Sequence, residues 1–242
     1  MISEKNKTEI DQVTAMYPET KQAFDAMQDE YIFMLSKMSH EIRNPLTLIY
    51  SSLQLIQSQH PEVKEFKYWQ EILIDVEYLR KLLLDMSTYN KGEKLTVSTI
   101  NIEEMLSLIV VSNEAKYFQN NASILFHAEP KIPIVIGDAT KLKQVFINLL
   151  KNACEAIDKK GIVCVDLSAA DEYVEINIAD NGMGIPPERY KDIFSPFVSF
   201  KETGSGLGLA ISKRIIDAHE GTLTFSSKEG KGSTFTVRLP IL

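Results

Sequence analysis

The chain has 242 residues, of which 44% are hydrophobic and 24% are charged, and 33 acidic against 26 basic side chains give it a formal net charge of −7. These values are typical of a globular protein with one large domain or two smaller ones. The acidic surplus disfavours nucleic acid as a partner. No apolar run approaches the roughly 18 residues of a membrane span, and two cysteines, Cys154 and Cys164, imply no disulfide framework.

Residues 1–29 are polar and compatible with a helix, but Tyr17-Pro18 interrupts them, because proline disfavours a helical conformation in the residue before it. We interpret this segment as a helical lead-in of unknown function. The first residues also lack the apolar stretch of a signal peptide.

Residues 30–92 carry two stripes of apolar residues at helical spacing, which indicates two helices of a bundle. The first stripe lies between Phe33 and Ile56 and comprises Leu35, Met38, Ile42, Leu46, Ile49, Leu53 and Ile56. After a break at His60-Pro61, the second comprises Trp69, Ile72, Val76, Leu79, Leu83 and Met86. The pattern predicts a helical hairpin. Because two helices cover each other on one side only, we expect a homodimer that completes a four-helix bundle.

Residues 93–242 mix helix and strand patterns and predict an α/β sandwich, so the overall class is α+β. Predicted strands lie near 96–100, 123–128, 162–168, 173–179, 222–227 and 233–239, and predicted helices at 102–118, 139–158 and 207–219. Neighbouring strands without a helix between them indicate a mixed sheet with helices on one face. Asp138 is the expected N-cap of the second helix, and Gly221 is expected to end the third.

His40 lies on the face of the first helix opposite its apolar stripe. At about 100° per residue it is about 160° from the centre of the stripe, so we expect it to point to solvent, with Asn44 on the same face and Glu41 at its flank. A lone exposed histidine is most often only a solvated side chain. Pro45 weakens that interpretation, because a proline inside a helix costs about 3 kcal/mol, and a neighbouring carboxylate favours a nucleophilic imidazole.

Two later segments suggest a nucleotide site. Asn148 and Asn152 share one helix face, and amide oxygens can ligate Mg²⁺. Asp180 ends a predicted strand just before Gly182 and Gly184, where a carboxylate can accept a hydrogen bond from an exocyclic amine. Taken singly, the asparagines are also typical of capping residues, and the aspartate of an ordinary turn.

A third segment, Gly204-Ser205-Gly206-Leu207-Gly208, opens a predicted helix. Glycines at a helix start expose backbone amides to phosphate, and the helix dipole favours negative charge there. The segment lacks the preceding strand of a Rossmann fingerprint and the lysine of a P-loop.

Residues 39–46, Ser-His-Glu-Ile-Arg-Asn-Pro-Leu, resemble the phosphoacceptor box of sensor histidine kinases of two-component systems. The three later segments together resemble the N, G1 and G2 boxes of the ATP-binding fold that these kinases share with Hsp90-type chaperones, gyrase-type topoisomerases and mismatch-repair ATPases. Residues 194–197 resemble the F box of the kinases, and residues 230–235 resemble their last glycine-rich turn. The resemblance covers residues 30–242 and assigns 30–92 to dimerisation and phosphotransfer and 93–242 to ATP binding.

The resemblance implies that His40 accepts the γ-phosphoryl group of ATP, with Glu41 as general base. Asn44 would position water for dephosphorylation of the partner response regulator. In the nucleotide site it assigns adenine recognition to Asp180, Gly182 and Gly184, Mg²⁺ ligation to Asn152, and support of the metal and phosphates to Asn148. The triphosphate would be flanked by Gly204, Gly206, Leu207 and Gly208. A mobile lid would run from Phe194 to Ser205, where Lys201 either approaches a phosphate or stays in solvent.

The implied function is ATP-dependent autophosphorylation on His40, followed by phosphoryl transfer to an aspartate in the receiver domain of a response regulator. Two alternatives use part of the same pattern. One is an ATP-hydrolysing machine of the chaperone or topoisomerase kind, and the other is a scaffold dimer that has lost ATP binding. The expected location is the cytoplasm, either as a separate protein or as the cytoplasmic part of a longer membrane-bound one.

Overall fold

The computed structural model describes residues 18–90, 95–118, 122–158, 160–170, 172–199 and 204–241. The chain divides into two compact units, residues 1–91 and 92–242. None of the helices in the described ranges combines the length and the apolar character needed to cross a membrane.

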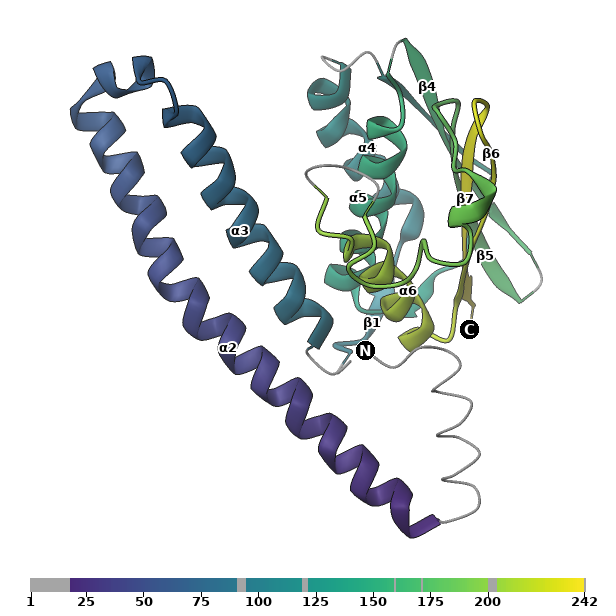
Figure 1. Cartoon of the computed structure of the whole chain (residues 1–242). Helices are drawn as coiled ribbons and strands as arrows, with labels where there is room; N and C mark the ends of the chain where they lie inside the picture. Colours follow the sequence, from purple (N-terminus) through teal and green to yellow (C-terminus); the bar gives the residue numbers. More distant parts are fainter. Residues whose placement is uncertain are drawn as a thin grey trace. The chain divides into compact units, whose positions relative to one another are not determined.

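The first unit is an antiparallel helical hairpin (Figure 1). Its first helix is α2, Pro18–Gln59, its turn is the short 3₁₀ helix η1, Pro61–Glu65, and its second helix is α3, Trp69–Asn90. Helix α2 begins at Pro18, where proline is favourable because the first turn needs no intrahelical N–H donor. It continues through residue 30 without a break, so the described part of the predicted lead-in and the first arm of the hairpin are one helix.

The contact between α2 and α3 follows a strict alternation of four and three residues on each helix. The inward positions are Ser39, Arg43, Leu46, Tyr50, Leu53 and Gln57 on α2, and Trp69, Leu73, Val76, Arg80, Leu83 and Ser87 on α3. Polar contacts confirm the register: the Trp69 indole donates to Gln57 Oε1 at 2.8 Å, and the Arg80 guanidinium lies 4.4 Å from the Tyr50 ring centre. This is the seam of a coiled-coil-like pair.

The predicted apolar stripe on each helix is therefore two stripes in the structure. Only some of its members face the partner helix of the same chain, such as Leu46, Leu53 and Leu83. A second set is 41–50% exposed within one chain and comprises Met38, Ile42, Ile49, Ile56, Ile72 and Leu79. The side chain of Leu35 lies outside the description. The prediction merged the two stripes because it counted apolar residues only, whereas half of the inward positions on α2 are polar.

The second unit contains a five-stranded mixed sheet and a two-stranded sheet. The larger sheet has the order β2-β4-β5-β7-β6, in which only β2 and β4 are parallel. Its strands are β2, Ala122–Ala128; β4, Gly161–Ala169; β5, Tyr173–Asp180; β6, Thr222–Lys228; and β7, Gly232–Pro240. The smaller sheet pairs β1, Ser98–Ile100, with β3, Val135–Gly137, antiparallel. The sequence did not predict β3, because three residues are too few to show an alternating pattern.

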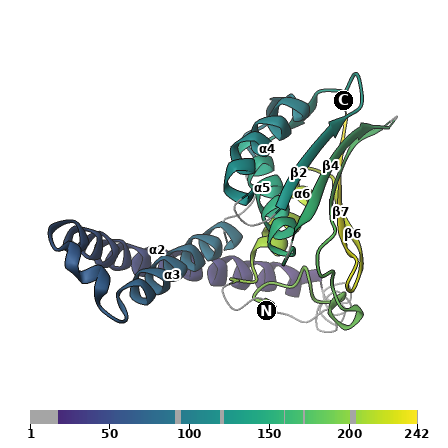
Figure 2. The same ribbon diagram turned by 90° about the horizontal axis from the view of Figure 1, so that it is seen from above.

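Helices cover one face of the five-stranded sheet, as Figures 1 and 2 show. They are α4, Ile102–Phe118; α5, Ala139–Glu155; and α6, Gly208–Ala218. A short 3₁₀ helix, η2, spans Pro187–Arg189. Alternate residues of β5, Val174, Ile176 and Ile178, are buried beneath the helices. The predicted fold class, a helical hairpin followed by an α/β sandwich with a mixed sheet and helices on one face, is confirmed.

The start of α5 and the end of α6 each have an identifiable cap. As predicted, Asp138 caps α5, since its Oδ1 accepts from the N–H groups of Thr140 and Lys141 at 3.1 Å each. At the end of α6 the Gly221 N–H donates to the Ile216 carbonyl at 3.0 Å. The residue in the left-handed conformation, however, is Glu220, with φ of 57°, rather than the glycine.

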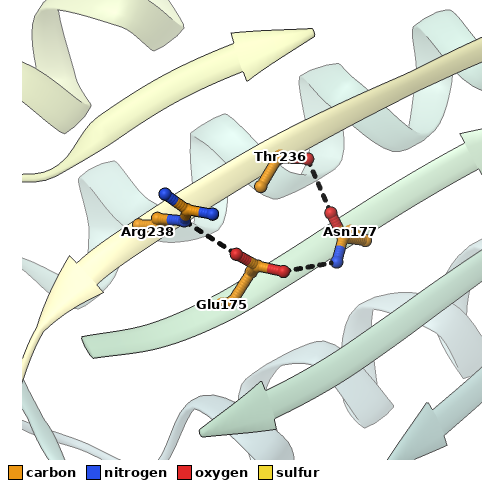
Figure 3. A network of polar contacts seen from close by, with 4 residues as sticks. All are labelled: Glu175, Asn177, Thr236 and Arg238. Carbon is orange, nitrogen blue, oxygen red and sulfur yellow. Dashed lines mark hydrogen bonds and ion pairs between the residues drawn. The ribbon is translucent and has the colours of Figure 1, made fainter. Parts of the chain in front are cut away.

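The open face of the sheet carries a polar network between β5 and β7 (Figure 3). Arg238 Nε donates to Glu175 Oε2 at 2.7 Å, Asn177 Nδ2 donates to Glu175 Oε1 at 3.0 Å, and the Thr236 hydroxyl donates to Asn177 Oδ1 at 2.6 Å. The hydrogen bonds from Arg238 and then from Asn177 lower the pKa of Glu175. This face is thus polar where the helix-covered face is apolar.

Candidate phosphoacceptor and nucleotide sites

His40 lies exposed on α2, with Glu41 and Asn44 also exposed, as the rotation argument predicts. Glu41 forms a long ion pair of 4.0 Å with Lys37, in which both side chains are about two-thirds exposed, at 67% and 66%. Such a pair contributes little, so it leaves the carboxylate available. Pro45 lies inside the helix and has no N–H for the Glu41 carbonyl, so the helix ladder lacks one bond beside His40.

The hairpin core next to His40 is made of small and polar side chains. Ser39 and Ser87 are buried between the helices, at 1% and 3% exposure. Arg43 Nη2 donates to the Leu83 carbonyl at 3.2 Å, while its buried Nε has no hydrogen-bond partner among the described residues. Apolar burial, the main stabilising term in such a core, is therefore interrupted by polar side chains at the level of His40.

In the second unit, Asn148 joins α5 to the start of α6. Its Nδ2 donates to the Ser212 hydroxyl at 3.0 Å, and a Cβ atom on Gly208 would lie 2.4 Å from its Oδ1. Asn152 follows one turn later and is half-buried. The fold thus brings together the predicted asparagine pair and the predicted glycine segment, which lie about 60 residues apart in the sequence.

Asp180 lies at the end of β5 and is only 8% exposed. Its Oδ1 accepts from the Gly182 N–H at 2.8 Å, which shapes the loop that follows. A Cβ atom on Gly182 would lie 2.2 Å from the carbonyl oxygen of Ala156, the C-cap of α5. The Asp180 loop therefore rests directly on the end of the helix that carries Asn152.

The last glycine-rich turn closes on the same loop. Gly184 has φ of 69°, and a Cβ there would lie 2.2 Å from the Lys228 carbonyl oxygen. Gly232 has φ of 104°, and a Cβ there would lie 1.9 Å from the Asp180 carbonyl oxygen. Only glycine combines this backbone conformation with such close approach. The sequence predicted a role for Gly184 but gave none to Gly232.

The segment expected to form the lid packs partly on the sheet and partly on the glycine segment. The ring of Phe194 meets that of Phe225 edge-on, 5.9 Å between centres. A Cβ atom on Gly206 would lie 2.6 Å from the backbone of Phe197, which itself is 53% exposed with φ of 63°. Lys201, for which a phosphate contact was one expectation, lies outside the described residues.

The glycine segment exposes only part of itself. Gly204, Gly206 and Gly208 are half-buried, but the side chain of Leu207 is fully buried. Any contact between Leu207 and a triphosphate would therefore use its backbone. The first turn of α6 supplies backbone N–H groups that have no acceptor within the helix, and the positive end of the helix dipole lies there too, and both favour an anion.

Magnesium fits the oxygen donors of this site. No group of three or more His, Cys, Asp or Glu side chains suitable for a metal ion occurs within the described ranges. Mg²⁺ usually keeps several water ligands and takes the others from substrate phosphates and one or two protein oxygens. The amide oxygens of Asn148 and Asn152 match that demand.

Two buried polar residues that join α5 to α6, Ser212 and His219, were not predicted from the sequence. Ser212 is 1% exposed and binds Asn148, and its position four residues after Gly208 is the signal that points to the same helix face. His219 is 6% exposed and accepts a hydrogen bond from the Asp138 N–H. No local pattern indicates that second contact, because its partners are 81 residues apart.

Two protein-family models match this chain, one for each of its two units. Residues 32–95 match the family model of the His Kinase A (phospho-acceptor) domain. Residues 137–242 match the model of the histidine kinase-, DNA gyrase B- and HSP90-like ATPases. His40 falls within the first match, and every predicted nucleotide-site residue falls within the second.

Similar proteins include sporulation kinase C of Bacillus subtilis (strain 168), which is 35% identical over 205 residues, covering 84% of this chain and 47% of that protein. The crystal structure of full-length ShkA in complex with AMPPNP is similar to this chain, with a TM-score of 0.75 at 25% identity. The match covers 86% of this chain and 45% of the ShkA chain. The structure of histidine kinase ThkA in complex with the response regulator protein TrrA matches with a TM-score of 0.66 at 28% identity. That match covers 92% of this chain and 66% of the matched chain. The chain thus spans about half the length of this sporulation kinase.

Proposed function

Because the chain belongs to the sensor histidine kinases of two-component systems, we propose that it transfers the γ-phosphoryl group of ATP to His40 and then to an aspartate of a response regulator. The observation that carries this assignment is an exposed histidine beside a carboxylate on α2, within the phosphoacceptor match. A phosphoryl acceptor has to be accessible, since both its donor and its final partner must reach the same nitrogen.

The second unit supplies the donor in this proposal. Asp180 accepts a hydrogen bond from the exocyclic amine of adenine, and the amides at the start of α6 hold the phosphates. Asn152 would ligate Mg²⁺ and Asn148 would support the metal and the phosphates, and the ion would neutralise the charge that builds up on the phosphates. The contacts of Asn148 with Gly208 and Ser212 support this arrangement, because they hold the asparagines beside the phosphate-binding turn.

In the transfer step, the unprotonated ring nitrogen of His40 attacks the γ-phosphorus. The N–P bond forms as the bond from phosphorus to the β–γ bridging oxygen breaks, and ADP leaves with that electron pair. Glu41 accepts the proton from the other ring nitrogen. Positioning and electrostatic stabilisation account for most of the rate in such transfers. The phosphoryl group then moves to a receiver aspartate, and Asn44 orients the water that later hydrolyses the aspartyl phosphate.

The working unit in this proposal is a homodimer. The exposed apolar stripe at Met38, Ile42, Ile49 and Ile56 on α2, with Ile72 and Leu79 on α3, has the spacing of a bundle seam. By residue number, Ile49 and His40 lie on opposite sides of α2, so a second copy can cover the stripe and leave His40 accessible. Residues 30–92 serve dimerisation and phosphotransfer, 93–242 bind ATP, and the lead-in at 1–29 has no assigned role.

The two alternative functions have less support. An ATPase machine of the chaperone or topoisomerase kind does not account for the phosphoacceptor match at residues 32–95. A scaffold without ATP binding does not account for the close glycine contacts at Gly182, Gly184, Gly206 and Gly208.

Labelling with γ-³²P-ATP tests the proposal. The His40→Gln variant should lose more than about 99% of the label while binding nucleotide as the unmodified protein does, since a side-chain amide is not a nucleophile. His60→Gln is the matched control, because His60 is also exposed on the hairpin and pairs with a carboxylate, Glu62, at 3.0 Å. Full labelling of His40→Gln, or loss of label in His60→Gln, would contradict the assignment.

A further inference from the structure

Helices α5 and α6 run antiparallel and are joined by side-chain hydrogen bonds at two levels. At the nucleotide end, Asn148 binds Ser212. At the far end, the Asp138 N–H donates to His219 Nε2 at 2.8 Å. The proposed nucleotide site uses the first contact, but nothing in it uses the second.

The partners of His219 select one protonation state. Because the Asp138 N–H can only donate, Nε2 carries no hydrogen. Nδ1 lies 2.7 Å from the Ile215 carbonyl, which can only accept, so Nδ1 carries the hydrogen. The buried imidazole is therefore neutral, and both ring nitrogens are bonded in a single tautomer.

Asp138 connects three segments of the second unit. Its Oδ1 caps α5, its N–H binds α6 through His219, and its Oδ2 accepts from the Thr96 N–H at 2.9 Å. Burial alone would raise the pKa of Asp138, but the N–H groups of Thr96, Lys141 and Thr140 hold it below the usual value. The Asp138 carboxylate thus stays charged. Its partner Thr96 is five residues after Lys91, where the first unit ends.

Gly137 gives a second, independent sign that the ring position matters. A Cβ atom there would lie 2.7 Å from His219 Cδ2 and 3.0 Å from Nε2. Every residue but glycine would therefore push the imidazole away from the Asp138 N–H.

We propose that His219 is a positioning residue for nucleotide binding. By accepting from the Asp138 N–H it holds α6 at a fixed axial position along α5, and this sets the distance between the glycine segment at the start of α6 and Asn148. Because helices are stiff, a shift at one end of the pair moves the other end as well. This inference rests on the proposed use of the α5–α6 end as the ATP site.

Two near-isosteric substitutions separate the two bonds of His219. In His219→Gln the side-chain oxygen reaches the position of Nε2 and can still accept from Asp138. In His219→Asn the amide nitrogen takes the position of Nδ1 and keeps the bond to Ile215, but no acceptor reaches Asp138. The measurement is titration of each variant of the 242-residue chain with Mg²⁺ and a non-hydrolysable ATP analogue. His127→Gln, at an exposed histidine on β2, is the control.

His219→Asn should weaken binding of the analogue about tenfold, because a buried N–H is left without an acceptor. His219→Gln should keep most of the affinity, and the control should keep all of it. Equal affinities for the Asn and Gln variants would overturn the inference, whether both are normal or both are weakened. If His219→Asn does not fold, the same titration is made with Gly137→Ala, which displaces the His219 ring but leaves Asp138 and Ile215 in place. Normal affinity of Gly137→Ala for the analogue would also overturn the inference.

Phosphorylation is measured separately in the same samples. Absence of phosphohistidine in the unmodified protein, together with an analogue affinity that still responds to His219→Asn, would refute the proposed function and leave the inference standing. Normal phosphorylation with no response to His219→Asn would refute the inference alone.

Discussion

A Cβ atom on Gly208 would lie 2.4 Å from Oδ1 of Asn148, so the first residue of α6 is in direct contact with the middle of α5. Gly208 is at a helix start where alanine would ordinarily be favoured over glycine by up to about 1 kcal/mol. The contact with Asn148 reverses that preference.

Gly208→Ala should therefore weaken binding of an ATP analogue about tenfold and lower the stability of the second unit, because the new methyl group displaces the Asn148 amide. Calorimetric titration and thermal unfolding measure the two effects. The matched test is a double-mutant cycle for stability: in an Asn148→Ala background the same Gly208→Ala change should cost at least about 1 kcal/mol less. Strict additivity of the two changes would argue against the contact.

Asp180→Asn should weaken the same analogue by about tenfold to a hundredfold, the usual range for losing a charged hydrogen-bond acceptor. The amide oxygen of asparagine can still accept from the Gly182 N–H, so the loop should keep its shape and the melting temperature should change little. Asp166→Asn, at an exposed aspartate on β4, is the control. An unchanged dissociation constant for Asp180→Asn would show that Asp180 does not recognise adenine.

Two adjacent substitutions at the end of α6 should have opposite effects on stability. Glu220 has φ of 57°, so Glu220→Gly should stabilise the fold by about 1 kcal/mol through relief of a left-handed conformation. Gly221→Ala should destabilise it by about 2 kcal/mol, because its Cβ would lie 2.4 Å from the Arg238 carbonyl oxygen. Thermal unfolding of the two variants checks the signs, and a change of the same sign in both would be inconsistent with this helix end.

The polar network on the open sheet face should make stability depend on pH in acid. The pKa of Glu175 is lowered from its usual 4.5, chiefly by the hydrogen bond from Arg238. Since the folded-state pKa is the lower one, the stabilising contribution is complete above about pH 4.5 and is lost as the pH falls through the folded-state value.

Glu175→Gln should therefore lower the melting temperature near pH 7, and the difference from the unmodified protein should shrink in acid. Thr236→Val removes the hydroxyl bonded to Asn177 but no titrating group, so its effect should not vary with pH. A Glu175→Gln effect that stays constant down to strongly acidic pH would contradict this assignment.

Charge placed on the exposed apolar stripe of α2 should separate the dimer. Ile49→Lys puts an ammonium group on a side chain that is 49% exposed within one chain and should raise the dimer dissociation constant at least about a hundredfold, because the charge would be desolvated without a partner. Leu48→Lys, one residue before Ile49 on α2 and 70% exposed, is rotated about 100° from the stripe and should leave the dimer intact. Analytical ultracentrifugation measures both constants, and equal dimerisation of the two variants would show that another surface mediates it.

Much of the fold follows from patterns that span only a few residues. Helical spacing predicts both arms of the hairpin, strand alternation predicts the five strands of the larger sheet, and Asp138 is recognisable as a cap from its position before an apolar helix. The outward position of His40 follows from rotation along a single helix. These features are local because backbone hydrogen bonds, caps and side-chain directions each depend on residues within one or two helical turns.

Other features depend on which elements pack together. The apolar stripes of the hairpin separate into an inward seam and an exposed face only once α3 lies against α2. Asn148 meets Ser212 across 64 residues, and Asp138 meets His219 across 81, contacts that no window of the sequence contains. The sequence by itself determined most of the elements and the residue types that we propose to hold ATP and to accept a phosphoryl group. The tertiary structure alone decided which backbones approach closely enough to require glycine and which buried polar groups become partners, because those outcomes depend on packing between segments distant along the chain.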